Sequence, residues 1–322
     1  MVVGAKSFAA LAGALWLAMG AHAAPDYPLR PVRMIVLFPP GGSDTVARML
    51  GQRLAERLGQ SFVIDNRPGA AGVIGADIVA KSPADGYTLL FATASFAISA
   101  GFDRKLPYDS IKDFSAIGFV AAVPFLLLTH PSVAANSVQE LLALARARPD
   151  QLNAASAGTG GAGHLATEVF KSMSGARITH IPYKGTGPAL TALLSGEAQL
   201  MFASIGGGLP QARAGKLRAL AVSSARRSSL VPELPTVAES GVPGYDAITW
   251  YGGLAPRATA PAVIGMLNRE IIAVLGAAEF RERLAALGIE PTVSTPQEFA
   301  AYLKADIAKW GRAIRDAGVT LN

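Results

Sequence analysis

Short apolar runs alternate with amphipathic stretches along most of this chain, and this alternation restricts its fold class. Residues 32–38 are apolar, a Pro-Pro-Gly-Gly turn follows, and residues 44–58 carry an apolar side chain at every fourth position from 46 onward. This spacing places the apolar side chains on one face of a helix, which Ser43 or Asp44 can cap at its N-terminus. Repetition of strand, loop and helix predicts α/β domains with mainly parallel sheets flanked by helices.

The same pattern continues to the C-terminus. Short apolar runs predict buried strands, and the stretch 114–128 predicts two strands that meet at Pro124. The expected strands are residues 32–38, 62–65, 88–92, 152–155, 178–181, 198–203, 217–222, 248–254 and 291–293. The expected helices are residues 44–58, a segment ending at 81, and residues 137–148, 163–174, 188–194, 209–214, 262–275, 280–287 and 296–317.

Length and composition favour two packed domains. The chain has 322 residues, enough for about two domains, and its 51% hydrophobic content excludes a generally disordered protein. Turn-rich stretches near Pro124 and at 232–245 predict two crossovers of the chain. One lobe (lobe 1) would then consist of residues 24–124 and 244–322, and an inserted lobe (lobe 2) of residues 125–243.

Residues 1–23 have the pattern of a secretory signal peptide. Lys6 supplies the positive charge, residues 8–19 form an apolar segment, and Ala21-His22-Ala23 offers a cleavage site. The apolar segment is too short to span a bilayer core of about 30 Å. An uncleaved anchor helix is the alternative interpretation. We therefore expect an exported, periplasmic protein that is cleaved near Ala23.

Cysteine content and charge exclude several functional classes. The chain has no cysteine, which excludes disulfide scaffolds, thiolate zinc sites, iron–sulfur clusters and a cysteine nucleophile. The net charge is +6, but the adjacent Arg226 and Arg227 form an isolated pair that is typical of a solvated loop. We therefore expect no nucleic-acid partner.

Two glycine-rich loops each connect an expected strand to an expected helix. They are Pro39–Asp44 and Gly158–His164. In an open α/β sheet, ligands bind beyond the carboxyl ends of the strands, where such loops lie. A helix N-terminus there offers unpaired N–H groups and a partial positive charge, which suit an anion. A tight turn without a ligand is the alternative for either loop.

The second loop matches the dinucleotide-binding pattern through Gly158, Gly160 and Gly163. That pattern also requires an acidic residue about 20 positions later, at the end of the next strand. The segment 178–183 has no carboxylate there, and His164 occupies the position where a phosphate-binding P-loop needs lysine. We therefore expect no nucleotide and no other cofactor.

Hydrolytic and metal sites are not indicated either. The segment around Ser43 lacks the second glycine of a hydrolase nucleophile elbow. His130, His164 and His180 have no metal-ligand spacing, and His164 at the start of a helix is typical of a cap contact or loop brace. We expect no catalytic residue and no metal. Aromatic side chains near strand ends are compatible with core packing or with a ligand cleft, namely Phe38, Tyr183, Trp250 and Tyr251.

Several motifs together resemble one family. They are PLRP at 28–31, FPPGGSD at 38–44, NRPGAAGVIG at 66–75, DGYTLL at 85–90, LPYDSIKD at 106–113, the loop 158–165, PYKGTGPALTALL at 182–194, LPTVAESGVPG at 234–244 and WYGGLAP at 250–256. In order and number they are similar to the Bug-type solute receptors, the periplasmic binding proteins of tripartite tricarboxylate transporters. The resemblance extends from residue 28 beyond 256.

The resemblance implies a two-lobed clamshell that closes on a small carboxylate. Mono- and dicarboxylates, amino acids and aromatic acids are the expected ligands, a membrane permease is the expected partner, and we expect a monomer. The implied ligand-binding residues are Phe38, Gly41, Gly42, Ser43, Asp44, Ala157, Gly158, Thr159, Gly163, His164 and Tyr183, with Ser95 and Ser204 as looser candidates. Ala162 departs from the family, in which a hydroxyl residue is common at this position.

Two other functions remain open from the sequence. A secreted serine-dependent hydrolase would need Ser43 or Ser95 within reach of His164. A sensor subunit would bind the same ligand but report to a signalling partner.

Overall fold

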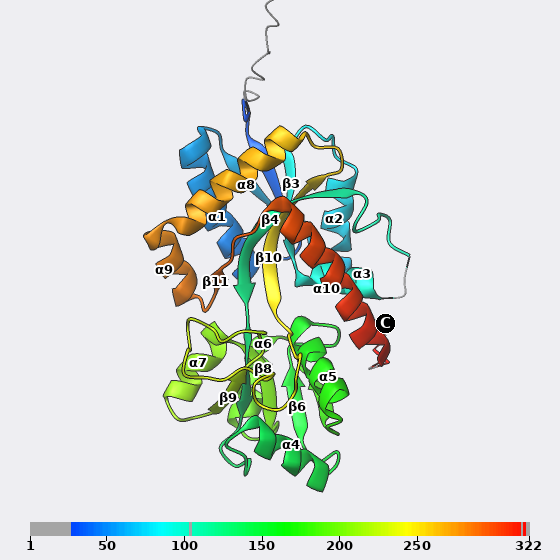
Figure 1. Ribbon diagram of the computed structural model, residues 1–322, viewed down its shortest axis with the longest axis vertical. Helices are drawn as coiled ribbons and strands as arrows, with labels where there is room; N and C mark the ends of the chain where they lie inside the picture. Colours follow the sequence, from blue (N-terminus) through cyan, green and yellow to red (C-terminus); the bar gives the residue numbers. More distant parts are fainter. Residues whose placement is uncertain (1–26, 103–104, 317, 320–322) are drawn as a thin grey trace, which may run out of the picture.

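The computed structural model describes residues 27–102, 105–316 and 318–319, which form two lobes joined by crossing strands (Figure 1). The expected signal peptide and its cleavage site lie outside the described residues. The first sheet contains β1 (Val32–Val36), β2 (Phe62–Asn66), β3 (Thr88–Thr93), β4 (Phe114–Val123), β10 (Thr249–Pro256) and β11 (Glu290–Pro291). The helices that precede or follow these strands in the sequence are α1 (Gly42–Leu58), η1 (Ala70–Gly72), α2 (Val73–Ala80), α3 (Ala94–Gly101), α8 (Pro261–Gly276), α9 (Ala278–Ala286) and α10 (Pro296–Asp316).

The second sheet is built from the middle of the chain. Its strands are β5 (Phe125–Thr129), β6 (Asn153–Ser156), β7 (Thr179–Pro182), β8 (Leu200–Ser204) and β9 (Arg218–Val222). Its helices are α4 (Val138–Ala147), α5 (Ala162–Ser174), α6 (Thr186–Leu194) and α7 (Ile205–Arg213). The chain passes from the first sheet to the second at Pro124 and returns between β9 and β10. The lobe boundaries at residues 124 and 244 stay a prediction.

The predicted two-lobed α/β architecture with flanking helices is confirmed, but both sheets are mixed rather than mainly parallel. In the order β11-β4-β10-β3-β1-β2, β1 is parallel to β2 and β3, whereas β10 is antiparallel to β3 and β4. In the order β7-β6-β8-β5-β9, β6 is parallel to β7 and β8, whereas β5 is antiparallel to β8 and β9. β5 and β10 each arrive from the other lobe, so they begin where the parallel strands end and run in the opposite direction.

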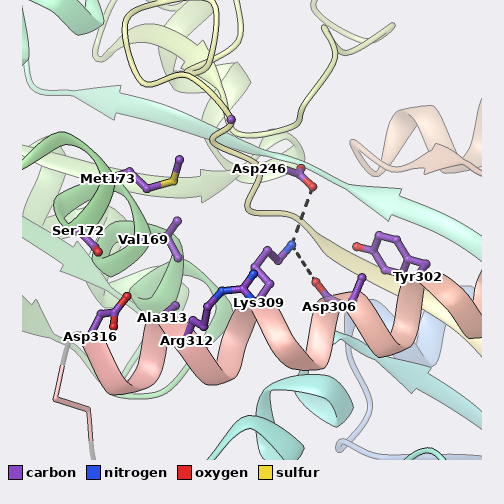
Figure 2. Close-up of a pocket in the computed structure, with 12 residues that line it drawn as sticks. Val169, Ser172, Met173, Asp246, Tyr302, Asp306, Lys309, Arg312, Ala313 and Asp316 are labelled. Carbon is purple, nitrogen blue, oxygen red and sulfur yellow. Dashed lines mark ion pairs between the residues drawn. The ribbon is translucent and has the colours of Figure 1, made fainter.

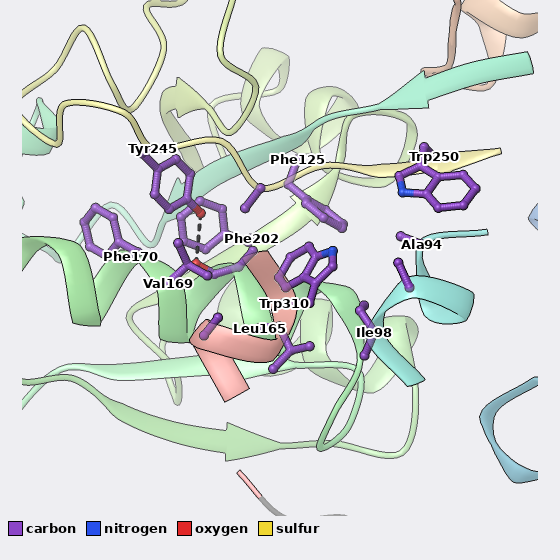
Figure 3. Close-up of a cluster of buried hydrophobic side chains, with 14 of the residues drawn as sticks. Ala94, Ile98, Phe125, Leu165, Val169, Phe170, Phe202, Tyr245, Trp250 and Trp310 are labelled. Carbon is purple, nitrogen blue, oxygen red and sulfur yellow. Dashed lines mark hydrogen bonds between the residues drawn. The ribbon is translucent and has the colours of Figure 1, made fainter. Parts of the chain in front are cut away.

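A buried aromatic cluster fills the junction between the two sheets (Figure 3). Tyr245 is fully buried, and its hydroxyl donates to the carbonyl oxygen of Ala166 in α5 at 2.9 Å. Trp250, also fully buried, donates its indole N–H to Oδ2 of Asp306 in α10 at 2.8 Å. Residues 245–250, the segment that crosses from the second sheet back to the first, are therefore held at one end against α5 and at the other against α10. We call these residues the crossing segment.

Helix α3 was not expected from the sequence. Thr93 caps it, because its hydroxyl oxygen accepts the N–H of Ser95 at 3.3 Å. No single helix among the described residues is long and apolar enough to cross a bilayer, and α8 and α9 reach that length only as a pair bent by 74°.

Candidate functional site

A cavity of about 440 Å³ lies between the two lobes. Strand ends and loops of the first sheet supply most of its wall, and the loop that precedes α5 supplies the rest. The lining residues are Phe38, Pro39, Gly41, Gly42, Ser43, Thr93, Ser95, Ile98, Gly160, Gly161, Ala162, Thr249 and Tyr251. The cavity is thus placed where the carboxyl ends of β1 and β3 face the second lobe.

The N-terminus of α1 is open toward this cavity. Gly41 precedes the helix and no side chain caps it. The first bond of the helix runs from the Thr45 N–H to the Gly41 carbonyl oxygen at 2.8 Å. The N–H groups of Gly42, Ser43 and Asp44 consequently have no acceptor within the helix. They are available to a ligand, together with the positive end of the dipole of this 17-residue helix.

Helix α5 presents the same arrangement from the second lobe. Gly161 precedes it without a side-chain cap, and the Leu165 N–H donates to the Gly161 carbonyl oxygen at 3.0 Å. The N–H groups of Ala162 and Gly163 therefore also lack a helical acceptor. By contrast, Thr93 caps α3 and Ser137 caps α4. The two helices that begin at the cavity without a cap come from opposite lobes.

The side chains that line the cavity are apolar or carry neutral hydroxyls. Among the described lining residues there is no lysine, arginine, aspartate or glutamate. Thr93 Oγ1 and Ser95 Oγ lie 2.6 Å apart, and burial raises the pKa of Tyr251 above its ordinary value, so that its hydroxyl stays protonated. Backbone N–H groups and hydroxyls are thus the donors that an anion would meet.

Several predicted site residues line the cavity and others do not. Phe38, Gly41, Gly42, Ser43 and Ser95 line it. Residues that were predicted but are not among its lining are Asp44, Ala157, Gly158, Thr159, Gly163, His164, Tyr183 and Ser204. The cavity is also lined by residues outside the predicted set, namely Pro39, Thr93, Ile98, Gly160, Gly161, Ala162, Thr249 and Tyr251. Of these, Tyr251 carries a signal in the sequence, because it is an aromatic residue near a strand end.

Other interactions engage the side chains of three predicted residues. Asp44 is buried and accepts a hydrogen bond from Arg48 Nε at 3.0 Å, which lowers the pKa of this carboxyl. The hydroxyl of Tyr183 donates to Glu197 at 2.9 Å. His164 is buried, with Nδ1 accepting the Gly160 N–H at 3.0 Å and Nε2 at 3.6 Å from Glu168 Oε1. Because both ring nitrogens are engaged, His164 is poorly placed to activate a serine.

A second cavity of about 520 Å³ lies where α5, α10 and the crossing segment meet (Figure 2). Lys309 projects into it between Asp306, at 2.8 Å, and Asp246, at 3.9 Å. Met173, near the C-terminus of α5, also lines it. The negative end of that helix dipole disfavours an anion, so this cavity is a poorer carboxylate site. No cluster of three or more potential metal ligands occurs in the described ranges.

The sequence and the fold are both similar to those of known proteins. Residues 46–319 match the family model of the tripartite tricarboxylate transporter family receptor, TctC. Protein BugT of Bordetella pertussis is 40% identical over 314 residues, covering 95% of this chain and 96% of BugT. The structure of R. palustris Rpa4515 with adipate is 40% identical, with a TM-score of 0.77, and the match covers 91% of this chain and 99% of that one.

A further solved structure extends the comparison. MatC of Rhodopseudomonas palustris with bound malate is 31% identical, with a TM-score of 0.73, and the match covers 89% of this chain and all of that one. Both of these structures hold a dicarboxylate. Given a family match over most of its length and a fold shared with solved members, the chain belongs to the TctC family of tripartite tricarboxylate transporter receptors.

Proposed function

We propose that this protein is a periplasmic receptor that captures a small carboxylate between its lobes and presents it to a membrane permease of the tripartite tricarboxylate type. The observation that carries the proposal is the pair of uncapped helix N-termini, α1 and α5, at one cavity without charged side chains. Such N-termini bind carboxylates through backbone N–H groups. The receptor acts without catalysis and as a monomer, since one chain supplies both lobes.

The expected affinity is that of a scavenger that must release its cargo. About four N–H bonds to a charged acceptor contribute roughly 1.5–3 kcal/mol each. They must offset an association cost of about 4 kcal/mol or more. A net free energy near −8 kcal/mol corresponds to a Kd of about 1 μM. A ligand that contacts both helices binds the closed arrangement better than the open one and thereby favours closure.

Dicarboxylates are the first ligands to test. Adipate and malate are bound in two relatives of this chain. The hydroxyls of Ser95, Thr249 and Tyr251 could donate to the group at the far end of such a ligand. Monocarboxylates, amino acids and aromatic acids belong in the same test, because neutral hydroxyls serve several acceptor groups.

Isothermal titration against adipate, malate, acetate, glutamate and benzoate tests the proposal. The informative variant is Ala162→Pro, which removes one N–H at the first position of α5, where proline is tolerated. The backbone of Gly161, with φ −73° and ψ 159°, is also compatible with a following proline. We expect binding to weaken roughly 10- to 100-fold, the equivalent of one charge-assisted hydrogen bond.

The matched control is Ala278→Pro, at the first position of α9. Ala278 is exposed, and Ala277 before it is extended, with φ −69° and ψ 128°. This variant should bind like the wild type. No heat from any ligand with cooperatively folded protein would contradict the proposal, and so would an equal loss in both variants. Turnover of a simple ester that His164→Ala abolishes would instead favour a hydrolase.

A further inference from the structure

The loop that precedes α5, residues 157–161, contains two glycines in conformations that other residues rarely adopt. The φ angles are +140° at Gly158 and +76° at Gly160. Glycine permits these angles but also leaves the chain free to adopt many others. The loop determines where α5 begins and where its free N–H groups point. Contacts from outside the loop must therefore hold these two glycines in place.

His164 holds Gly160 directly. Its Nδ1 accepts the Gly160 N–H at 3.0 Å, and the side chain is almost completely buried. An accepting Nδ1 places the ring proton on Nε2, which faces Glu168 Oε1 at 3.6 Å. Burial favours a neutral Glu168, but the facing His164 ring and the hydrogen bond from Lys171 at 2.9 Å outweigh it and lower the pKa of this carboxyl. The anionic Glu168 thus fixes the tautomer of His164.

His180 holds Gly158 through a serine. Its Nε2 lies 2.6 Å from Ser156 Oγ. That same oxygen accepts the Gly158 N–H at 3.2 Å and lies 3.1 Å from the Gly158 carbonyl oxygen. The rings of His180 and His164 stack with centroids 3.7 Å apart and an angle of 19° between their planes. One stacked histidine pair therefore fixes both positive-φ glycines of the loop.

We propose that His164 is a positioning residue for the ligand site: its neutral ring accepts the Gly160 N–H and fixes the loop that presents the α5 N–H groups, and protonation of the ring releases that loop. This inference rests on the proposed function. An imidazolium has no free lone pair, so it cannot accept the Gly160 N–H. Ligand affinity then falls when the ring is protonated.

The loop of the first lobe has no such sensitivity. There the side-chain amide of Asn66 donates to the carbonyl oxygen of Phe38 at 2.8 Å, and an amide does not titrate. The groups that face His164 are Glu168 and Lys171 of its own helix and His180 of β7. The charged residues of α10, Asp306 and Lys309, line the second cavity beside Val169 and Met173. Protonation of His164 therefore acts on the second lobe alone.

Nuclear magnetic resonance of the unliganded protein tests whether the His164 ring holds the Gly160 N–H. The ring nitrogen shifts should show His164 protonated at Nε2, and the Gly160 amide should be protected from hydrogen exchange. Lowering the pH from about 7.5 until the ring nitrogen shifts report a protonated His164 should remove this protection. In His164→Gln, whose amide oxygen can also accept an N–H, Gly160 protection should not change with pH. A Gly160 amide that stays protected in the wild type while His164 is protonated would overturn the inference.

Titration with adipate over the same pH range tests the link to binding. We expect the wild type to lose about tenfold in affinity on acidification, the value of one hydrogen bond, and His164→Gln to lose much less. His130→Gln is the matched control, because His130 contacts Ser132 away from the cavity, and it should follow the wild type. Equal pH slopes in all three proteins would overturn the inference. If adipate binds none of the three proteins at any pH, adipate is not the ligand. The hydrogen exchange of Gly160 then decides by itself whether His164 positions the loop.

Discussion

The indole N–H of Trp250 donates to Oδ2 of Asp306 at 2.8 Å, which ties β10 to α10. Trp310 donates to the same oxygen at 3.0 Å. Side chains alternate along a strand, so a buried Trp250 leaves Thr249 and Tyr251 on the opposite face, where they line the cavity. The hydrogen bond therefore positions two cavity residues that never contact Asp306 themselves.

Lys309→Met should destabilise the protein. Asp306 is 2% exposed, and Lys309 is the cation that pairs with it at 2.8 Å. Removal of the ammonium leaves a buried carboxylate with the two indole N–H groups as its remaining donors. We expect a loss of about 2 kcal/mol in the free energy of unfolding, measured with urea.

Arg312→Met is the control for this substitution. Arg312 lies on the same helix and lines the same second cavity, but its side chain is exposed. The free energy of unfolding should change by less than about 0.5 kcal/mol. If the two variants lose the same amount, the effect comes from helix α10 in general and not from the pairing with Asp306.

Gly158→Ala should destabilise the protein through backbone strain. A Cβ at this position would meet only an ordinary contact, 3.6 Å from the Tyr183 carbonyl oxygen, so space is not the obstacle. The φ of +140° is the obstacle, and we expect a loss of about 2 kcal/mol. Gly265→Ala, inside α8 with room for a Cβ, should instead stabilise by about 0.5–1 kcal/mol. Thermal unfolding of both variants shows whether the signs are opposite.

The sequence predicts a helix well where one face of that helix is polar and the opposite face is apolar. The segment 44–58 was expected as a helix from its four-residue spacing, and α1 spans Gly42–Leu58. Helix α3 was missed because most of its side chains, including Phe96 and Ile98, are buried, so no polar face marks it. The sequence predicts a helix at 209–214, but α7 already begins at Ile205. The prediction begins too late because three consecutive glycines give the first turn no helical pattern.

The lining of the cavity between the lobes was predicted less completely than the helices, for a different reason. The loop at Gly41 and Gly42 was found because glycines after a strand are a local signal. Thr249 and Tyr251 reach the cavity only because β10 pairs with β3, where Tyr251 lies opposite Thr93. That pairing joins positions far apart in the chain and runs antiparallel, contrary to the predicted sheet. The strand-end position of Tyr251 is a local signal for its ring, but no local pattern places these two hydroxyls beside the loop at Gly41 and Gly42.

Tyr251→Phe should weaken binding of ligands with an acceptor at both ends. Tyr251 lines the cavity, and a Cβ on Gly42, which also lines it, would lie 3.7 Å from the hydroxyl oxygen of Tyr251. Loss of one hydrogen bond should cost about 1 kcal/mol, or roughly fivefold in the Kd of adipate. Tyr27→Phe, which removes a hydroxyl bonded to the Gly86 carbonyl oxygen away from the cavity, should leave the Kd unchanged. Equal Kd values for all three proteins would remove Tyr251 from the ligand site.

Stability should fall on acidification because of His180. Burial and the nearby charge of His164 lower the pKa of His180 from 6.5 to about 4 in the folded protein. Between these values the unfolded chain binds the proton more readily than the folded one. The contribution of His180 is therefore complete above about pH 6.5 and is lost as the pH falls toward about 4. Because the ring is only half-buried, solvent screening reduces the loss to the order of 1 kcal/mol.

Urea unfolding at several pH values measures this loss. His180→Gln has no titrating ring, so its free energy of unfolding should depend less steeply on pH between about 4 and about 6.5 than that of the wild type. His130→Gln, which removes a histidine that contacts Ser132, should keep the wild-type dependence. A His180→Gln slope equal to that of the wild type would mean that the folded protein protonates this imidazole as easily as the unfolded chain does, and the stacked pair would then not keep His180 neutral.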